Sequence, residues 1–269
     1  MVFVKIFRES NGFTTGLNID PLPWDISSSC FYSGFYYTTI EHIFDYIYLY
    51  SDPDRVLIAE IEIPDDAKVH AKEKMWKADK IIIKEFIPLE NYLIPEEICM
   101  AAVQEYGLAL QYVKKQSPEI CMAAVQEHAI ALLAVEEQTP EICMVAVMKN
   151  GLALQWVKKQ SPEICMEAVQ EDASALQYVE EQTPEICLAA VQRYGHGWTL
   201  KYVKKQSPEI CMAAVQNAGE ALEYVEEQSP EICMAAVQQD ESALQYVEEI
   251  CMAAVEDFLR TRTHVVCNI

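Results

Sequence analysis

A nine-residue motif, Pro-Glu-Ile-Cys-Met-Ala-Ala-Val-Gln, returns eight times with small changes between Pro95 and the C-terminus. Its cysteines are Cys99, Cys121, Cys143, Cys165, Cys187, Cys211, Cys233 and Cys251. They follow one another at steps of 22, 22, 22, 22, 24, 22 and 18 residues. A period of this size is typical of solenoids, in which each repeat contacts only its neighbours. We therefore expect an all-α solenoid of about 7.5 two-helix repeats of 22 residues each over residues 94–262.

Each repeat begins with a helix-start signal. In the repeat from Ser117 to Gln138, a hydroxyl N-cap is followed by proline and glutamate. Proline is favoured at the first helical position, and a carboxylate in the first turn offsets the helix dipole. The signal returns at Thr139, Ser161, Thr183, Ser207 and Ser229. Because each proline forces a new start, one continuous helix is excluded.

The first helix of each repeat carries an apolar stripe, which in the same repeat is Ile120, Cys121, Ala124 and Val125. The position of Ala124 is alanine in every copy, which predicts a close helix approach. The preceding position varies and is expected to face solvent. The predicted structural core is therefore Cys121, Ala124, Val125, Cys143, Cys165, Cys187, Cys211 and Cys233. A helix-packing separation between equivalent cysteines exceeds disulfide reach, and no metal-ligand spacing occurs.

The second helix centres on Ala-Leu-x-Tyr-Val and carries an aromatic column. Its members are Tyr112, Trp156, Tyr178, Tyr202, Tyr224 and Tyr246, with Ala134 as the exception. Such a column suits either a ligand groove or core packing with hydroxyl groups at the rim, and we favour packing.

A longer period of 44 residues is visible in the charges. Lysine pairs at 114–115, 158–159 and 204–205 alternate with glutamate pairs at 136–137, 180–181 and 226–227. Gly107, Gly151 and Gly195 stand in the turns where Ala129 and Ala173 stand in the other repeats. Stacking would place each lysine pair beside a glutamate pair and oppose register slips. Inheritance from a duplicated pair of repeats explains the alternation equally well.

The first-turn glutamates are expected to form an acidic edge. Glu97 begins the row, and the candidate partner-binding residues are Glu119, Glu141, Glu163, Glu185, Glu209 and Glu231. Compensation of the helix dipole explains them without a partner, whereas a basic partner could use them as a surface. The last repeat lacks its Gln-Ser-Pro-Glu linker, so we expect one capping helix over about 242–260 and a tail over 263–269.

The composition limits the class of partner. The formal charge of −22 on 269 residues disfavours nucleic acid and anionic membrane surfaces. A protein partner, including a basic one, remains compatible. No apolar segment is long enough for a transmembrane helix. Ten cysteines without a signal peptide favour an intracellular, reducing compartment.

Residues 1–93 differ from the repeats in composition, because runs of β-branched and aromatic residues are separated by turn signals. They predict a small α+β domain. We expect strands over 2–7, 35–38, 55–63 and 78–87 and a helix over 40–50. Cys30 with His42 or His70 could act as nucleophile and base, but no flanking signature supports that pair. No phosphate-binding loop or metal-ligand spacing occurs, so we expect no cofactor and no catalysis.

Several segments carry a family resemblance. Residues 15–21, 34–39 and 76–82 resemble the N-terminal domain of giant-virus ankyrin-repeat proteins of the mimivirus kind. Residues 95–260 resemble a repeat family of unknown function shared by giant viruses and Legionella, and no ankyrin motif is present. These resemblances imply a viral protein, in the host cytoplasm or the virion, without an established activity.

The strand order of residues 34–63 is also similar to the core of ADP-ribosyltransferases. That resemblance implies a catalytic glutamate, but the matching strand offers Asp79 and Lys80, as in a degenerate site. We therefore expect a non-catalytic interaction scaffold. The alternatives are an enzyme that the solenoid targets and a structural or self-assembling viral protein.

Overall fold

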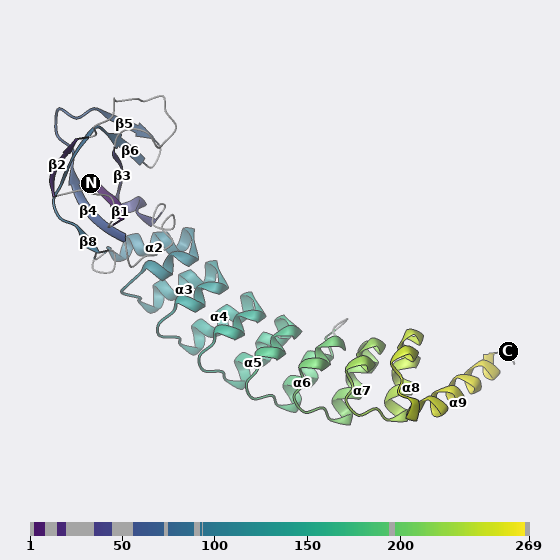
Figure 1. Ribbon diagram of the computed structural model, residues 1–269. Coiled ribbons are helices and arrows are strands. Elements are labelled where there is room, and N and C mark those ends of the chain that lie inside the picture. Colours follow the sequence, from purple (N-terminus) through teal and green to yellow (C-terminus); the bar gives the residue numbers. More distant parts are fainter. Residues whose placement is uncertain are drawn as a thin grey trace. The chain divides into compact units, whose positions relative to one another are not determined.

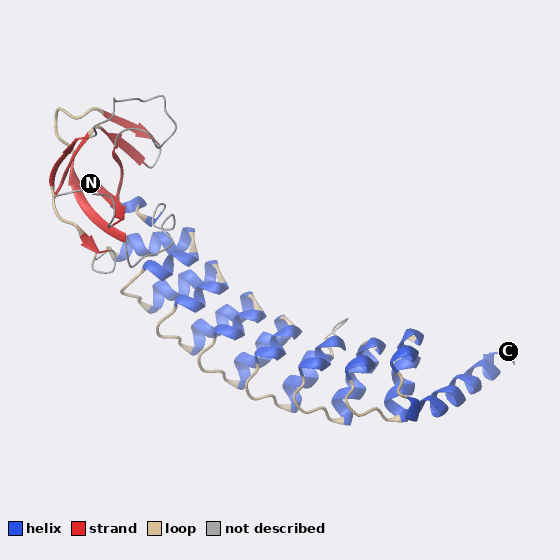
Figure 2. Ribbon diagram, in the orientation of Figure 1, coloured by secondary structure: helices blue, strands red, loops and turns tan. Residues whose placement is uncertain are grey.

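A computed structural model of the chain describes residues 3–8, 15–19, 35–44, 56–72, 75–88, 92, 94–193 and 197–266. The chain divides into two compact units, Met1–Glu127 and His128–Ile269. Strands occupy the N-terminal part of the first unit, and regularly repeated helices follow (Figures 1 and 2). The predicted fold class is confirmed. The change from strand to helix near residue 94 lies inside the first unit, so the division into a domain of residues 1–93 and a solenoid of residues 94–262 stays a prediction.

The described strands form one antiparallel sheet in the order β2-β7-β4-β1-β3-β6-β5, with β8 paired to β4. They are β1 Phe3–Arg8, β2 Gly16–Ile19, β3 Phe35–Thr39, β4 Val56–Glu62, β5 Val69–Lys72, β6 Met75–Ala78, β7 Lys80–Ile83 and β8 Ile87–Pro88. Predicted strands over 2–7, 35–38 and 55–63 correspond to β1, β3 and β4.

The single strand predicted over 78–87 is wrong. The chain bends at Asp79, whose carboxylate accepts a hydrogen bond from the Lys68 amide at 2.8 Å. This bend changes the strand partners, because β6 pairs with β3 and β5 whereas β7 pairs with β2 and β4. The helix predicted over 40–50 begins as the 3₁₀-helix η2 Ile40–His42, and residues 45–50 lie outside the described part.

The sheet buries apolar side chains in two clusters, because neighbouring residues of a strand face opposite ways. Ile58 belongs to one cluster and Ala59 to the other. The Ile58 cluster also packs against Ile98 and Tyr112 of the first repeat. Within the first unit, the sheet therefore covers the apolar surface of that repeat, where a solenoid needs an end cap.

Each repeat consists of an α-helix and a 3₁₀-helix. The α-helices are α2 Glu96–Glu105, α3 Pro118–Glu127, α4 Pro140–Lys149, α5 Pro162–Glu171, α6 Pro184–Val191, α7 Pro208–Asn217 and α8 Pro230–Gln239. The 3₁₀-helices are η5 Gly107–Tyr112, η6 Ala129–Ala134, η7 Gly151–Trp156, η8 Ala173–Tyr178, η9 Gly197–Tyr202, η10 Gly219–Tyr224 and η11 Glu241–Tyr246.

The predicted helix starts are confirmed. In α5, the Ser161 hydroxyl accepts a hydrogen bond from the Ile164 amide at 3.3 Å, with Pro162 as the first helical residue. The second helix is 3₁₀ throughout its six residues. A valine in extended conformation ends it, such as Val179 at φ −70° and ψ 118°. The glycine that opens η9 is Gly197, so the assignment of Gly195 to that place is wrong.

The predicted capping helix over 242–260 is also wrong. Residues up to Tyr246 form η11, and Val247 ends it in the same extended conformation that ends the other 3₁₀-helices. The final helix, α9, runs from Glu249 to Val266 and so includes part of the predicted tail. Loss of the proline linker therefore did not fuse the two helices, because the extended valine still separates them.

Candidate functional site

The predicted acidic edge places one exposed glutamate at the second residue of each α-helix from α3 to α8. The six are Glu119, Glu141, Glu163, Glu185, Glu209 and Glu231. Among the described residues, none of these carboxylates forms an ion pair. A hydrogen bond from its own backbone amide and another from the N-cap hydroxyl lower the pKa of Glu141, Glu163, Glu185 and Glu231. These four carboxylates therefore favour the ionised form, and all six edge glutamates are open to solvent.

Substitution of Ser161 by alanine is expected to lower the free energy of unfolding by about 1 kcal/mol, because the Ile164 amide loses its acceptor. The pKa of Glu163 lies below its ordinary value of 4.5 in the folded protein, partly through Ser161. This contribution is present above the unfolded pKa and is lost as pH falls through the folded pKa. The difference between wild type and variant, measured by urea denaturation, should therefore shrink below about pH 4.

The control is Ser174→Ala in the same repeat, which removes a hydroxyl without removing an N-cap. It should change the free energy of unfolding by less than about 0.5 kcal/mol. Equal effects from the two substitutions would contradict a capping role for Ser161.

The predicted core residues are buried. Cys121, Ala124 and Val125 are at most 3% exposed, and so are Cys143, Cys165, Cys187, Cys211 and Cys233. Burial raises the pKa of the thiols of Cys143, Cys165, Cys187 and Cys211, and raises that of Cys233 to about 12. A buried thiol with a raised pKa is a poor nucleophile and a poor metal ligand. The cysteine column is therefore a packing element.

A row of glutamines joins the repeats and was missed in the sequence. We call Gln138, Gln160, Gln182, Gln206 and Gln228 the glutamine ladder. The side-chain Nε2 of each donates to a backbone carbonyl of the next repeat at 2.8 Å. The Oε1 accepts from a backbone amide two residues further on, at 2.9–3.0 Å.

The ladder also fixes the cysteine column. The Sγ of Cys165 donates to Oε1 of Gln160 at 3.3 Å, and the other ladder members accept similar bonds at 3.2–3.7 Å. The signal in the sequence was the glutamine that precedes every Ser-Pro or Thr-Pro, while the charges before it alternate. The side-chain amide of each ladder glutamine thus joins two repeats and also accepts a hydrogen bond from one thiol.

The lysine pairs were expected to lie beside glutamate carboxylates. Two of the three pairs instead bond backbone carbonyls of a neighbouring repeat. The Nζ of Lys158 donates to the carbonyls of Val135 at 3.0 Å and Glu136 at 2.9 Å. Lys204 repeats this pattern in a later repeat, with the carbonyls of Val179 and Glu180 both at 2.9 Å. In these two pairs, the first lysine therefore bonds the backbone of the preceding repeat.

The aromatic column is half-buried, and one repeat adds a cation to it. The rings of Trp198 and Tyr202 meet edge to face at 6.0 Å between centroids. The Nζ of Lys201 lies 4.9 Å from the centroid of each ring. This cluster belongs to η9, in the repeat that carries the 24-residue step. These contacts all join residues of η9, as expected if the aromatic column serves packing.

The N-terminal sheet holds one perturbed amine. Lys5 of β1 donates to the Tyr36 carbonyl at 2.8 Å, and burial lowers its pKa to about 8. Of the residues in the ADP-ribosyltransferase-like strand, Asp79 accepts from the Lys68 amide and Lys80 pairs with Asp66. His42 and His70 are described, whereas Cys30 lies outside the described residues. The structure therefore does not test whether Cys30 meets either histidine.

Within the part of the chain that the structure describes, no three His, Cys, Asp or Glu side chains are placed to hold a metal ion. No described helix has the length and apolar character needed to cross a membrane.

The family model described as a domain of unknown function (DUF4116) matches residues 139–183. That segment spans α4, η7, α5 and η8, which are two successive repeats. No curated protein and no solved structure matches the chain. The chain is therefore similar to that family over one pair of repeats.

Proposed function

We propose that the protein is a non-catalytic scaffold or adaptor that binds a basic protein segment along its acidic edge. One observation carries the proposal. In each repeat the apolar, thiol and linker-glutamine side chains serve stacking, whereas one ionised glutamate stays exposed at a fixed position. Exposed carboxylates of one sign at regular intervals attract a complementary partner and speed its association.

The strength of such binding depends on the number of repeats. A single exposed ion pair contributes only about 0.3 kcal/mol, so one repeat alone would bind weakly. Five equal contributions along the second unit amount to about a tenfold gain in affinity. The repetition of Glu141, Glu163, Glu185, Glu209 and Glu231 therefore supports a partner with several basic residues.

The proposal also covers the origin of the protein and the compartment in which it acts. The resemblance of residues 15–21, 34–39 and 76–82 to giant-virus proteins supports a viral protein in the host cytoplasm or the virion. Burial of the solenoid thiols as free cysteines supports a reducing compartment. The involvement of Asp79 and Lys80 in structural contacts favours the scaffold over the enzymatic alternative.

The test compares two charge-matched variants of the full chain. One carries Glu→Gln at positions 141, 163, 185, 209 and 231, and the other carries Glu→Gln at 137, 171, 181, 227 and 241, which are also exposed. Binding of Lys- and Arg-rich peptides is measured by fluorescence anisotropy at low salt and at about 1 M salt.

We expect the edge variant to bind about tenfold more weakly than wild type, and the control variant to bind within about twofold. Binding should also weaken strongly with salt, because these charges are exposed. Equal weakening in both variants would show that only net charge matters. Unchanged binding in the edge variant would refute the acidic edge as the site.

A further inference from the structure

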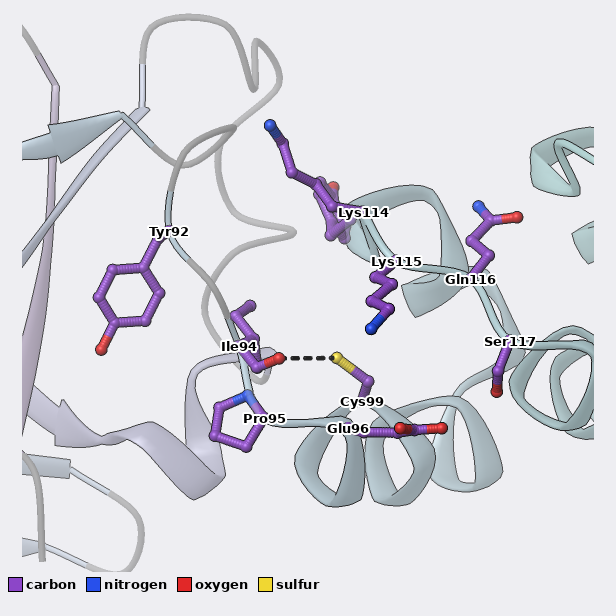
Figure 3. Close-up of a pocket in the computed structure, with 10 residues that line it drawn as sticks. Tyr92, Ile94, Pro95, Glu96, Cys99, Lys114, Lys115, Gln116 and Ser117 are labelled. Carbon is purple, nitrogen blue, oxygen red and sulfur yellow. Dashed lines mark hydrogen bonds between the residues drawn. The ribbon is translucent and has the colours of Figure 1, made fainter.

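The array departs from its repeat pattern at both ends. In the first repeat, Ile94 stands at the position, relative to the cysteine, that a ladder glutamine takes in later repeats. The Cys99 Sγ therefore donates to the Ile94 backbone carbonyl at 3.8 Å, beside a pocket of about 300 Å³ (Figure 3). At the other end the ladder glutamine Gln228 is kept, and the departure lies in the charges.

We call the contact that a ladder glutamine makes between two repeats a joint, and the one made by Gln228 the last joint. Earlier joints bring a lysine pair to a glutamate pair, because the two alternate along the chain. The pair in the last repeat is Glu248-Glu249, where the alternation predicts lysine, and it faces Glu226-Glu227 across the last joint. Residues 206–259 contain no lysine, arginine or histidine. The last joint therefore gathers carboxylates without a cation from this stretch.

The backbone of the last joint places residue 248 as earlier joints place a lysine. The Oε1 of Gln138 accepts a hydrogen bond from the Lys158 amide at 2.9 Å. In the last joint, Oε1 of Gln228 accepts from the Glu248 amide at the same distance. The two joints therefore share their frame and differ in the side chain that it carries.

The carbonyl groups that receive a lysine amine also keep their conformation. In the earlier joints, the valines that supply one of these carbonyls are Val135, at φ −72° and ψ 118°, and Val179, at φ −70° and ψ 118°. The equivalent Val225 lies at φ −77° and ψ 118°. The last joint therefore presents the same receiving backbone.

The receiving carbonyls of the last joint lack a donor. They belong to Val225 and Glu226, and among the described residues neither carbonyl accepts a hydrogen bond. The ionised Glu248 side chain cannot donate one. The joint of Gln160 also has a glutamate, Glu180, at this position, but there the facing pair is Lys158-Lys159. The last joint has neither the lysine donor nor a facing lysine pair.

We propose that the last joint binds a primary ammonium group of another molecule, either a lysine side chain of a polypeptide or a polyamine. The ammonium donates to the Val225 and Glu226 carbonyls, as the Lys158 and Lys204 amines donate at 2.9–3.0 Å in earlier joints. The carboxylates of Glu226 and Glu248 attract it by charge complementarity. None of the acidic-edge glutamates belongs to this site.

The test measures three probes on the full chain by isothermal titration, up to about 5 mM probe at about 0.1 M salt. The probes are the terminally blocked tetrapeptide Gly-Lys-Lys-Gly, the same peptide with both amines acetylated, and the polyamine spermidine. We expect the lysine peptide or spermidine to bind and the acetylated peptide not to bind. Nuclear magnetic resonance shifts should locate the contact at the amides of residues 226, 227 and 248. The tighter of the two amines identifies the source of the ammonium.

Glu248→Lys restores the lysine of the earlier joints within the chain. It should weaken binding of the amine probes at least tenfold and raise the midpoint of thermal unfolding by about 2 °C, because its own amine takes the place. The matched control is Glu180→Lys, which makes the same change of charge in a joint that already holds Lys158-Lys159. It should leave the affinity within about twofold and should not raise the midpoint.

Three results would overturn the proposal. One is the absence of binding by both amines at about 5 mM. Another is equal weakening by Glu248→Lys and Glu180→Lys, because net charge alone would then explain it. The third is a set of shifted amides elsewhere in the chain, a result that needs no variant to fold. The edge variant of the preceding section leaves the last joint unaltered and should bind the short peptide as wild type does, so the two proposals succeed or fail separately.

Discussion

Replacement of Ala168 by leucine is expected to lower the free energy of unfolding by about 3 kcal/mol, because it overpacks a closed contact. Ala168 is 0% exposed in α5. A Cβ atom placed on Gly151 of η7 would lie only 2.4 Å from the Ala168 carbonyl oxygen, so the two backbones already approach closely. The isobutyl side chain that replaces the methyl group has no space without separation of α5 from its neighbours.

The control introduces the same side chain one residue earlier. Glu167→Leu changes a position that is alanine or valine in other repeats and is only half-buried here. It should alter the free energy of unfolding by less than about 0.5 kcal/mol. Guanidinium denaturation followed by circular dichroism gives the comparison, and hydrogen exchange of the α5 amides shows whether the loss is local. Equal denaturation midpoints for the two variants would contradict the close approach.

Substitution of Gln160 by alanine is expected to lower the free energy of unfolding by about 2–3 kcal/mol. It removes hydrogen bonds to the Tyr178 carbonyl and the Glu180 amide, and it leaves the Cys165 thiol without its acceptor. The bonds to the Tyr178 carbonyl and the Cys165 thiol are partly buried, so water replaces the lost partners there incompletely. Because the bonds join two repeats, the loss should weaken the interface between them more than either repeat alone.

Gln177→Ala provides the matched control. Gln177 is an exposed glutamine whose Nε2 donates only within its own repeat, to the Ser174 carbonyl at 3.0 Å. Its removal should change the free energy of unfolding by less than about 0.5 kcal/mol. Hydrogen exchange in the Gln160 variant should accelerate first at the amides around Glu180. A uniform acceleration along the whole chain would argue against a local joint.

The helix starts and the core could be predicted because each depends on a local signal. Ser161, Pro162 and Glu163 act within one turn, and invariance of the Ala168 position reports tight packing directly. The 3₁₀ character of the second helix could not be predicted, because apolar spacing over six residues fits either helix type. The same ambiguity hid the break at Val247, where an extended backbone ends η11 without proline or glycine.

The glutamine ladder was missed because polar linker residues are normally solvated. Gln160 reaches a repeat that begins after it in the chain, and such a contact depends on stacking that one sequence does not specify. The pocket beside Ile94 was missed for the same reason. The exception at residue 94 has meaning only once the role of glutamine at that position in later repeats is known.

The glutamine ladder gives the array a direction. The bonds that these glutamines make between repeats all run toward the C-terminus, so every internal repeat receives one amide from behind and offers one ahead. Insertion or deletion of a whole repeat would preserve all of these joints, because each new neighbour finds the same donor and acceptor. The number of repeats can therefore change in gene duplication without redesign of the ladder, while the two ends, which differ chemically, must be kept.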